Sequence, residues 1–134
     1  MSLNLVSLLP DDKNDTAKAE ALVALGYPAI STVVPDLLEW IQDLNWPVAH
    51  IILPFLKKVG TPLASDVRAI IQGSDDTWKY SVLCGLVGES RELAAELVVD
   101  LQRLVIRPTA GEVSEELDIC ANEILNKFSL NTET

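Results

Sequence analysis

The chain has 134 residues, of which 49% are hydrophobic and 22% are charged, with 20 Asp and Glu against 10 Lys and Arg. This size and apolar content fit one folded domain and exclude a chain that is disordered throughout. The net charge of -10, with Lys57–Lys58 as the only basic pair, argues against binding to the phosphate backbone of DNA or RNA.

Three features of the sequence bear on the cellular compartment of the protein: the N-terminus, the length of the apolar runs and the cysteines. The first nine residues lack the basic and apolar regions of a signal peptide, and no apolar run approaches the ~20 residues that span a bilayer. Cys84 and Cys120 both lie in apolar helical stretches, where cysteines are commonly buried free thiols. Free thiols are typical of a reducing compartment, so we expect a cytoplasmic protein without a membrane partner.

The first predicted helical hairpin occupies residues 17–41. Its first helix begins after the capping pair Asn14–Asp15 and ends before Gly26, a residue typical of helix ends. Its second helix begins near Pro35, because proline is favoured in a first turn. Hydrophobic residues at helical spacing mark the two buried faces: Ala17, Ala21, Leu22 and Leu25, then Val34, Leu37, Leu38 and Ile41.

The second predicted hairpin occupies residues 47–71. Pro47 stands where a first turn is expected, and Gly60 ends the first helix before Thr61–Pro62 turns the chain. Pro54 lies inside the first helix and is expected to kink it. The hydrophobic faces are Val48, Ile51, Ile52, Phe55, Leu56 and Val59, then Leu63, Val67, Ile70 and Ile71.

The third predicted hairpin follows the next polar link. Its first helix is expected to end at Gly88, and a single second helix is expected over residues 91–106. A final helix is expected over residues 111–128, and the polar tail 129–134 is expected to fray. The first helix is marked by Val82, Leu83, Leu86 and Val87.

Asp11, Asp43 and Asp75 open the polar links before the three hairpins, and they stand thirty-two residues apart. A period of this size is typical of stacked helical-hairpin repeats. Arg107 stands at the next step, a departure expected of a terminal capping unit. We therefore expect one all-α domain over residues 1–134, a right-handed α-α superhelix of three helical hairpins and a C-terminal capping helix.

Two resemblances sharpen this expectation. A kinked first helix, a straighter second helix and an Asp near the link resemble the HEAT repeat, with Pro54 as the kink. Four strings also resemble the small bacterial family known as domain of unknown function 5071: Leu25–Ile30, Leu38–Ala49, Trp78–Tyr80 and Arg107–Thr109. The similarity extends from about Leu8 to Leu125. It implies a single-domain HEAT-like protein and no assigned activity, so it carries no functional residues.

Residues that could carry chemistry are sparse. His50 is the only histidine, and Pro54 stands four residues on, where a second metal ligand would be needed. The carboxylate pairs at Asp11–Asp12, Asp75–Asp76 and Glu115–Glu116 are better explained as caps at helix starts than as a general acid and base. We expect no catalytic residue, no cofactor and no metal site.

Trp40, Trp46 and Trp78 are the three tryptophans of a chain with only 5% aromatic residues. Trp46 and Trp78 occupy equivalent repeat positions, so stacked repeats would bring them to one face. Either they wedge between repeats as core packing, or they form an aromatic ridge that grips a partner, with Trp40, Lys79 and Tyr80 beside them. Burial of the indoles separates these interpretations.

These patterns favour a non-enzymatic protein-protein interaction module that uses a solenoid face with Trp46 and Trp78. The partner would be a protein or peptide, and the acidic balance favours a basic one. A second hypothesis is an acidic immunity protein that neutralises a basic bacterial toxin. A third is an enzyme of unrecognised type, although a HEAT-like DNA glycosylase would need a cationic surface. The open ends of a solenoid would also allow a homodimer.

Overall fold

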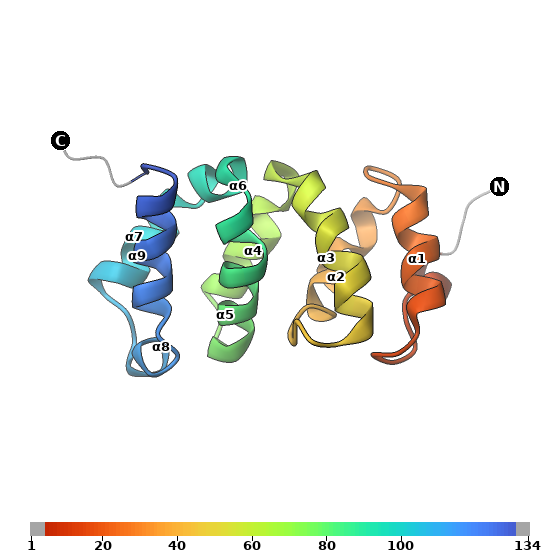
Figure 1. Ribbon diagram of the computed structural model, residues 1–134, viewed down its shortest axis with the longest axis horizontal. Coiled ribbons are helices and arrows are strands. Elements are labelled where there is room, and N and C mark those ends of the chain that lie inside the picture. Colours follow the sequence, from red (N-terminus) through yellow and green to blue (C-terminus); the bar gives the residue numbers. More distant parts are fainter. Residues whose placement is uncertain (1–4, 131–134) are drawn as a thin grey trace. The chain divides into compact units, whose positions relative to one another are not determined.

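The computed structural model describes residues 5–130, and every regular element in that range is a helix, as predicted (Figure 1). The α-helices are α1 (Thr16–Leu25), α2 (Val34–Glu39), α3 (Pro47–Val59), α4 (Ala64–Ile71), α5 (Asp76–Gly85), α6 (Arg91–Glu96), α7 (Val98–Ile106), α8 (Ala110–Ser114) and α9 (Leu117–Lys127). Short 3-10 helices are η1 (Leu5–Leu8), η2 (Ser31–Val33), η3 (Thr61–Leu63) and η4 (Val87–Glu89). No helix among these is both long enough and apolar enough to cross a bilayer. The tail predicted to fray lies outside the described residues from position 131 onward.

The helices divide after Val59 into two compact units. In the first unit α1 packs against α3, and η1 contacts α1. A backbone hydrogen bond of 3.1 Å from the N–H of Val48 to the C=O of Lys13 ties the start of α3 to the link before α1. Pro54 lies inside α3 on an exposed side. The buried face of α3 is Val48, Ala49, Ile52 and Leu56, so the predicted periodicity positions this helix against α1.

In the second unit α9 packs against both α5 and α7 (Figure 1). In addition, α4 contacts α5, α8 contacts α9, and α6 contacts η3 and η4. Completely buried side chains from these helices form the core: Val82, Leu83, Leu86, Leu93, Leu101, Leu104, Leu117 and Ala121. Because burying one such aliphatic side chain stabilises a fold by ~1.5–3 kcal/mol, this core holds α5, α7 and α9 together.

The aspartates of the predicted links accept hydrogen bonds in turns and caps. Asp75 caps α5, since its carboxylate accepts the backbone N–H of the residue three positions on at 3.0 Å. Asp43 accepts the N–H of Asn45 at 2.9 Å, and in the first link Asp12 accepts the N–H of Asn14 at 2.8 Å. These bonds give Asp12, Asp43 and Asp75 structural roles in turns and a helix cap. In the first link the residue that accepts the turn hydrogen bond is Asp12, the second residue of the Asp11–Asp12 pair.

Two predicted helices are broken in the structure. The helix expected over 91–106 is divided at Leu97 into α6 and α7, and the helix expected over 111–128 is divided into α8 and α9. Leu97 is completely buried, so the hydrophobic spacing continues across the first break and gives no sign of it. At the second break Glu116 has a φ of 60°, a left-handed conformation that ends α8. Glu116 stands at the N-cap of α9, but its side chain makes no capping hydrogen bond.

Glycines end three of the helices. Gly26 and Gly60, predicted at the ends of α1 and α3, have φ angles of 76° and 71°, a region that glycine enters without steric cost. The helix predicted to end at Gly88 ends instead at Gly85, and Gly88 is buried within η4.

Candidate functional site

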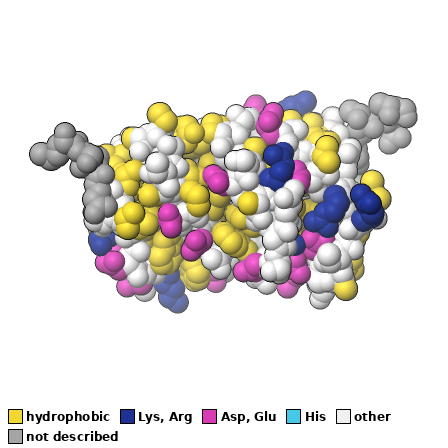
Figure 2. Space-filling model, turned by 180° about the vertical axis from the view of Figure 1, so that it is seen from behind, with side chains coloured by type: hydrophobic (Ala, Val, Ile, Leu, Met, Phe, Trp, Pro, Cys, Tyr) yellow, Lys and Arg dark blue, Asp and Glu magenta, His cyan; other side chains and the backbone are white. Residues whose placement is uncertain are grey.

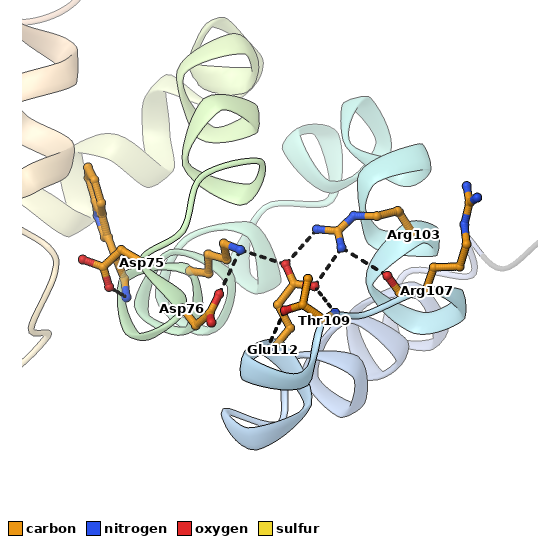
Figure 3. A network of polar contacts seen from close by, with 8 residues as sticks. Asp75, Asp76, Arg103, Arg107, Thr109 and Glu112 are labelled. Atoms are coloured by element: carbon orange, nitrogen blue, oxygen red, sulfur yellow. Dashed lines mark hydrogen bonds and ion pairs between the residues drawn. The ribbon is translucent and has the colours of Figure 1, made fainter.

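A buried ion network joins α5, α7 and α8 in the second unit (Figure 3). Lys79 is 2% exposed, and its Nζ lies 2.8 Å from Oε2 of Glu112 and 2.9 Å from Oδ1 of Asp76. Glu112 is 1% exposed and accepts two parallel bonds, of 2.7 Å and 2.8 Å, from the guanidinium of Arg103. Because bidentate pairs of this kind are strong and directional, they fix the three helices relative to one another.

The start of α8 places the Glu112 carboxylate. The hydroxyl of Thr109 accepts the N–H of Glu112 at 3.1 Å, and Oε1 of Glu112 accepts the N–H of Thr109 at 2.8 Å. This reciprocal capping box turns the glutamate side chain back over the beginning of the helix. Arg103 lies in the last turn of α7, where it also donates to the C=O of Arg107 at 3.3 Å and so satisfies a carbonyl at the helix end.

Hydrogen bonds within the network stabilise the charged forms of Glu112 and Lys79. The hydrogen bonds from Arg103 lower the pKa of Glu112 most; burial opposes them, and bonds from Lys79 and the Thr109 backbone lower the pKa further, to about 2. Burial alone would lower the pKa of Lys79, but its hydrogen bonds with Glu112 and Asp76 outweigh burial and raise that pKa. Such a carboxylate and ammonium keep their charges at neutral pH, which suits a structural ion pair better than a general acid and base.

A pocket of about 230 Å³ lies beside this network. It is lined by Ile71, Gln72, Gly73, Lys79, Arg103, Thr109 and Glu112. The charges of Lys79 and Glu112 are already paired with protein groups, so a ligand in this pocket would have to compete with bonds that the fold itself uses.

The first unit brings together two of the predicted site residues. Trp40 and Trp46 meet at the link between α2 and α3, with ring centroids 5.8 Å apart and planes at 64°, an edge-to-face contact. Both side chains are half-buried. Each indole is thus held by a neighbour and still presents part of its surface to solvent.

The remaining predicted site residues lie in the first turns of α5 in the second unit. Trp78 is half-buried and Tyr80 is 41% exposed, whereas Lys79 points into the interior. Lys79 was expected on the same surface, but Asp76 and Glu112 hold its ammonium, so its side chain cannot reach a partner. Trp78 and Tyr80 therefore remain at least partly accessible to a partner, whereas Lys79 is not part of the accessible surface.

The histidine and the two cysteines lie on helices α3, α5 and α9. His50 is exposed on α3. Cys84 and Cys120 are free thiols, as expected, but only Cys120 is buried, whereas both were expected to be. Their Sγ atoms lie 3.1 Å apart, which the sequence did not indicate. Among residues 5–130, no group of three or more His, Cys, Asp or Glu side chains is arranged to hold a metal ion.

Comparison of the sequence with models of protein families identifies the family of this chain. The model of a family described as Domain of unknown function (DUF5071) matches residues 8–125, most of the chain. The chain belongs to the DUF5071 family. No curated protein matches it.

Sequence reasoning on this DUF5071 chain missed Arg103 and Glu112. A signal for the glutamate was present, since Thr109 and Glu112 form the Thr-x-x-Glu pattern of a capping box. Glu112 also follows Lys79 by 33 positions, close to the repeat period, so stacked hairpins would bring the two together. Arg103 gave no comparable signal, because a basic residue in a last helical turn is commonly solvated.

Proposed function

We propose that this DUF5071 protein is a non-enzymatic protein-protein interaction module that contacts a protein or peptide through a surface containing Trp46 and Trp78. The observation that carries the proposal is their partial burial at the starts of α3 and α5. A half-buried indole is held in place by the fold and still exposes part of its apolar ring. Tryptophan is enriched in binding hot spots because a rigid ring buries much area at low entropic cost.

The partner is expected to be basic. An exposed aspartate stands three positions before each tryptophan, Asp43 before Trp46 and Asp75 before Trp78. An indole beside a carboxylate suits a Lys or Arg side chain, through a cation-π contact and an ion pair. On the face drawn in Figure 2, hydrophobic, acidic and basic side chains are all exposed to solvent.

We further propose that the hairpins stack as a right-handed superhelix of HEAT-like repeats. Two contacts in the second unit support a repeat. Nε of Arg68 bonds to Oδ2 of Asp100 at 2.9 Å, 32 positions along the chain, and Lys79 bonds to Glu112, 33 positions along. Contacts at the repeat period are expected where equivalent positions of consecutive hairpins stack.

Affinity capture followed by a binding measurement tests the proposed surface. Partners recovered with the wild-type protein are purified, and their affinity is compared with that of a Trp46→Ala/Trp78→Ala double variant. Loss of two hot-spot residues should weaken binding on the order of 100-fold or more. Val99→Ala, which shortens a side chain that is 77% exposed on α7, is the matched control and should bind as the wild type does. Undiminished binding by a correctly folded double variant would overturn the proposal.

A second pair of substitutions tests the basic character of the partner. In Asp43→Asn/Asp75→Asn two exposed charges are removed, but asparagine keeps the side-chain oxygen that accepts the capping bonds. Binding should weaken and should depend less on salt, with the unfolding temperature unchanged. If affinity and salt dependence both stay at the wild-type values, the aspartates do not contact the partner.

The net charge of -10 also favours a second candidate, an acidic immunity protein that neutralises a basic toxin enzyme. A toxin gene next to the gene of this chain, and inhibition of that toxin by the purified protein, would support it. Binding dominated by charge should fall steeply as salt rises, whereas binding centred on the indoles should fall less. Consistent absence of a neighbouring toxin gene would count against this candidate.

A further inference from the structure

Two cysteines meet where α5 packs against α9 in the second unit. The Sγ atoms of Cys84 and Cys120 lie 3.1 Å apart, although the residues are 36 positions apart in the sequence. A disulfide bond is about 2.05 Å long, so the sulfurs need to approach by roughly a further 1 Å. Rotation about the Cα–Cβ bonds of the two cysteines is the smallest change that brings the sulfurs together.

The two thiols differ in accessibility. Cys120 is buried, whereas Cys84 is partly exposed. Burial raises the pKa of the Cys120 thiol, and the hydrogen bond and charge of Cys84 raise it further, so Cys120 stays protonated at neutral pH. An external reagent therefore reaches Cys84 first. A pocket of about 190 Å³ beside the pair is lined by Leu83, Cys84, Gly88, Cys120, Glu123, Ile124 and Lys127.

We propose that Cys84 and Cys120 form a redox site, a dithiol that a small disulfide of the glutathione type oxidises to an intramolecular disulfide between α5 and α9. The two sulfurs are already in contact, one of them is accessible, and a pocket adjoins both residues. This site uses neither tryptophan, but it adjoins the predicted binding surface, because the side chain of Tyr80 hydrogen-bonds to Cys84.

The oxidation proceeds in two exchange steps. The thiolate of Cys84 attacks one sulfur of the small disulfide and forms a mixed disulfide. The other half leaves as a thiolate and takes up a proton from solvent. The Cys120 thiol then loses its proton to solvent, and its sulfur attacks Sγ of Cys84 and expels the second half as a thiolate, which is protonated in turn. The two protein thiols lose two electrons, and the small disulfide is reduced to two thiols.

The first step makes the second step easier. Once Cys84 is in the mixed disulfide, its thiol no longer raises the pKa of Cys120 through a hydrogen bond and a charge. Lys127 lines the same pocket, where its Nζ bonds to the C=O of Gly88 at 2.6 Å. That ammonium also pairs with Glu89 at 3.4 Å, and the charge of Glu123 raises the pKa of the Cys120 thiol. Burial then remains as the main obstacle to ionisation of Cys120.

Mass spectrometry of the whole chain tests the proposal. Reduced wild-type protein is incubated with oxidised glutathione under native conditions and then treated with a thiol-blocking reagent. We expect a monomer that is lighter by about 2 Da and takes up no blocking reagent even after unfolding, because both thiols are consumed. Two blocked thiols, a stable glutathione adduct on the wild type, or a disulfide-linked dimer would each overturn the proposal.

Single serine variants test the order of the steps. Cys120→Ser keeps the accessible thiol but lacks the one that completes the exchange, so it should accumulate a stable adduct with one glutathione. Cys84→Ser keeps only the buried thiol and should form an adduct roughly tenfold more slowly or not at all. Equal rates of adduct formation in the two variants would overturn the assignment of Cys84 as the point of attack.

Discussion

Lys79 and Glu112 stand 33 positions apart in the sequence, yet Nζ of the lysine lies 2.8 Å from Oε2 of the glutamate with both side chains nearly inaccessible to solvent. Moving two charges out of water costs free energy that a single ion pair often fails to return. Here each charge has further partners, because Lys79 also bonds to Asp76, and Glu112 also bonds to Arg103 and Thr109. The pair is thereby held in one geometry between α5 and α8.

Removal of the lysine should destabilise the protein strongly. In Lys79→Met the side-chain volume is nearly kept, but Glu112 loses one cationic partner and Asp76 loses the ammonium beside it. We expect a loss on the order of 3 kcal/mol in the free energy of unfolding, measured by urea denaturation. Lys58→Met, at an exposed position in the last turn of α3, is the control and should change stability by less than about 0.5 kcal/mol. Equal effects of the two substitutions would show that burial of Lys79 does not matter.

The Glu112 carboxylate should make stability depend on pH in the acid range. Its pKa is about 2 in the folded protein and near 4.5 in the unfolded chain. Between these values the unfolded state binds a proton that the folded state does not, so stability falls as pH decreases through this window. The contribution is fully present above pH 4.5 and amounts to at most roughly 3 kcal/mol.

Urea denaturation between pH 6 and pH 3 measures this contribution. Glu112→Gln should be less stable than the wild type at pH 6 and should lose less stability on acidification. Glu20→Gln removes an exposed carboxylate on α1 and should keep the wild-type pH profile. A Glu112→Gln profile parallel to that of the wild type would mean that another carboxyl group dominates acid unfolding.

Gly111 provides a test of how closely α8 approaches α5. A Cβ at this position would collide with Oδ2 of Asp76, whose other oxygen bonds to Lys79. Gly111→Ala should therefore destabilise by about 1–2 kcal/mol although alanine favours helices. In an Asp76→Ala background the collision is absent, and the same substitution should be neutral or stabilising by about 0.5–1 kcal/mol. If the effect of Gly111→Ala is the same in both backgrounds, the two residues are not in contact.

The hydrophobic spacing predicted where the helices lie and several of their ends, because these are local properties of each segment. It did not predict every buried face. Of the residues predicted to form the buried face of α1 only Leu22 is buried; Ala17, Ala21 and Leu25 are exposed, and Ala19 is buried instead. Gly26 and Gly60 are further local signals, and both end helices as expected. The break at Leu97 was not predicted, because a leucine at this position would be buried whether the helix is continuous or broken. The contact between Lys79 and Glu112 depends on how hairpins pack, so the sequence offered only the repeat spacing as an indirect sign.

The disulfide proposed between Cys84 and Cys120 should raise the unfolding temperature. A link between residues 36 positions apart constrains the unfolded chain, and for a loop of this length the stabilisation is roughly 3–4 kcal/mol. In a chain of this size that corresponds to an increase on the order of 10 °C, measured by circular dichroism on oxidised and reduced protein. Cys84→Ser is the matched control and should unfold at the same temperature with and without reductant. A lower unfolding temperature after oxidation would mean that closure of the bond strains the packing of α5 on α9 by more than the constraint on the unfolded chain contributes. Oxidation would then loosen this contact.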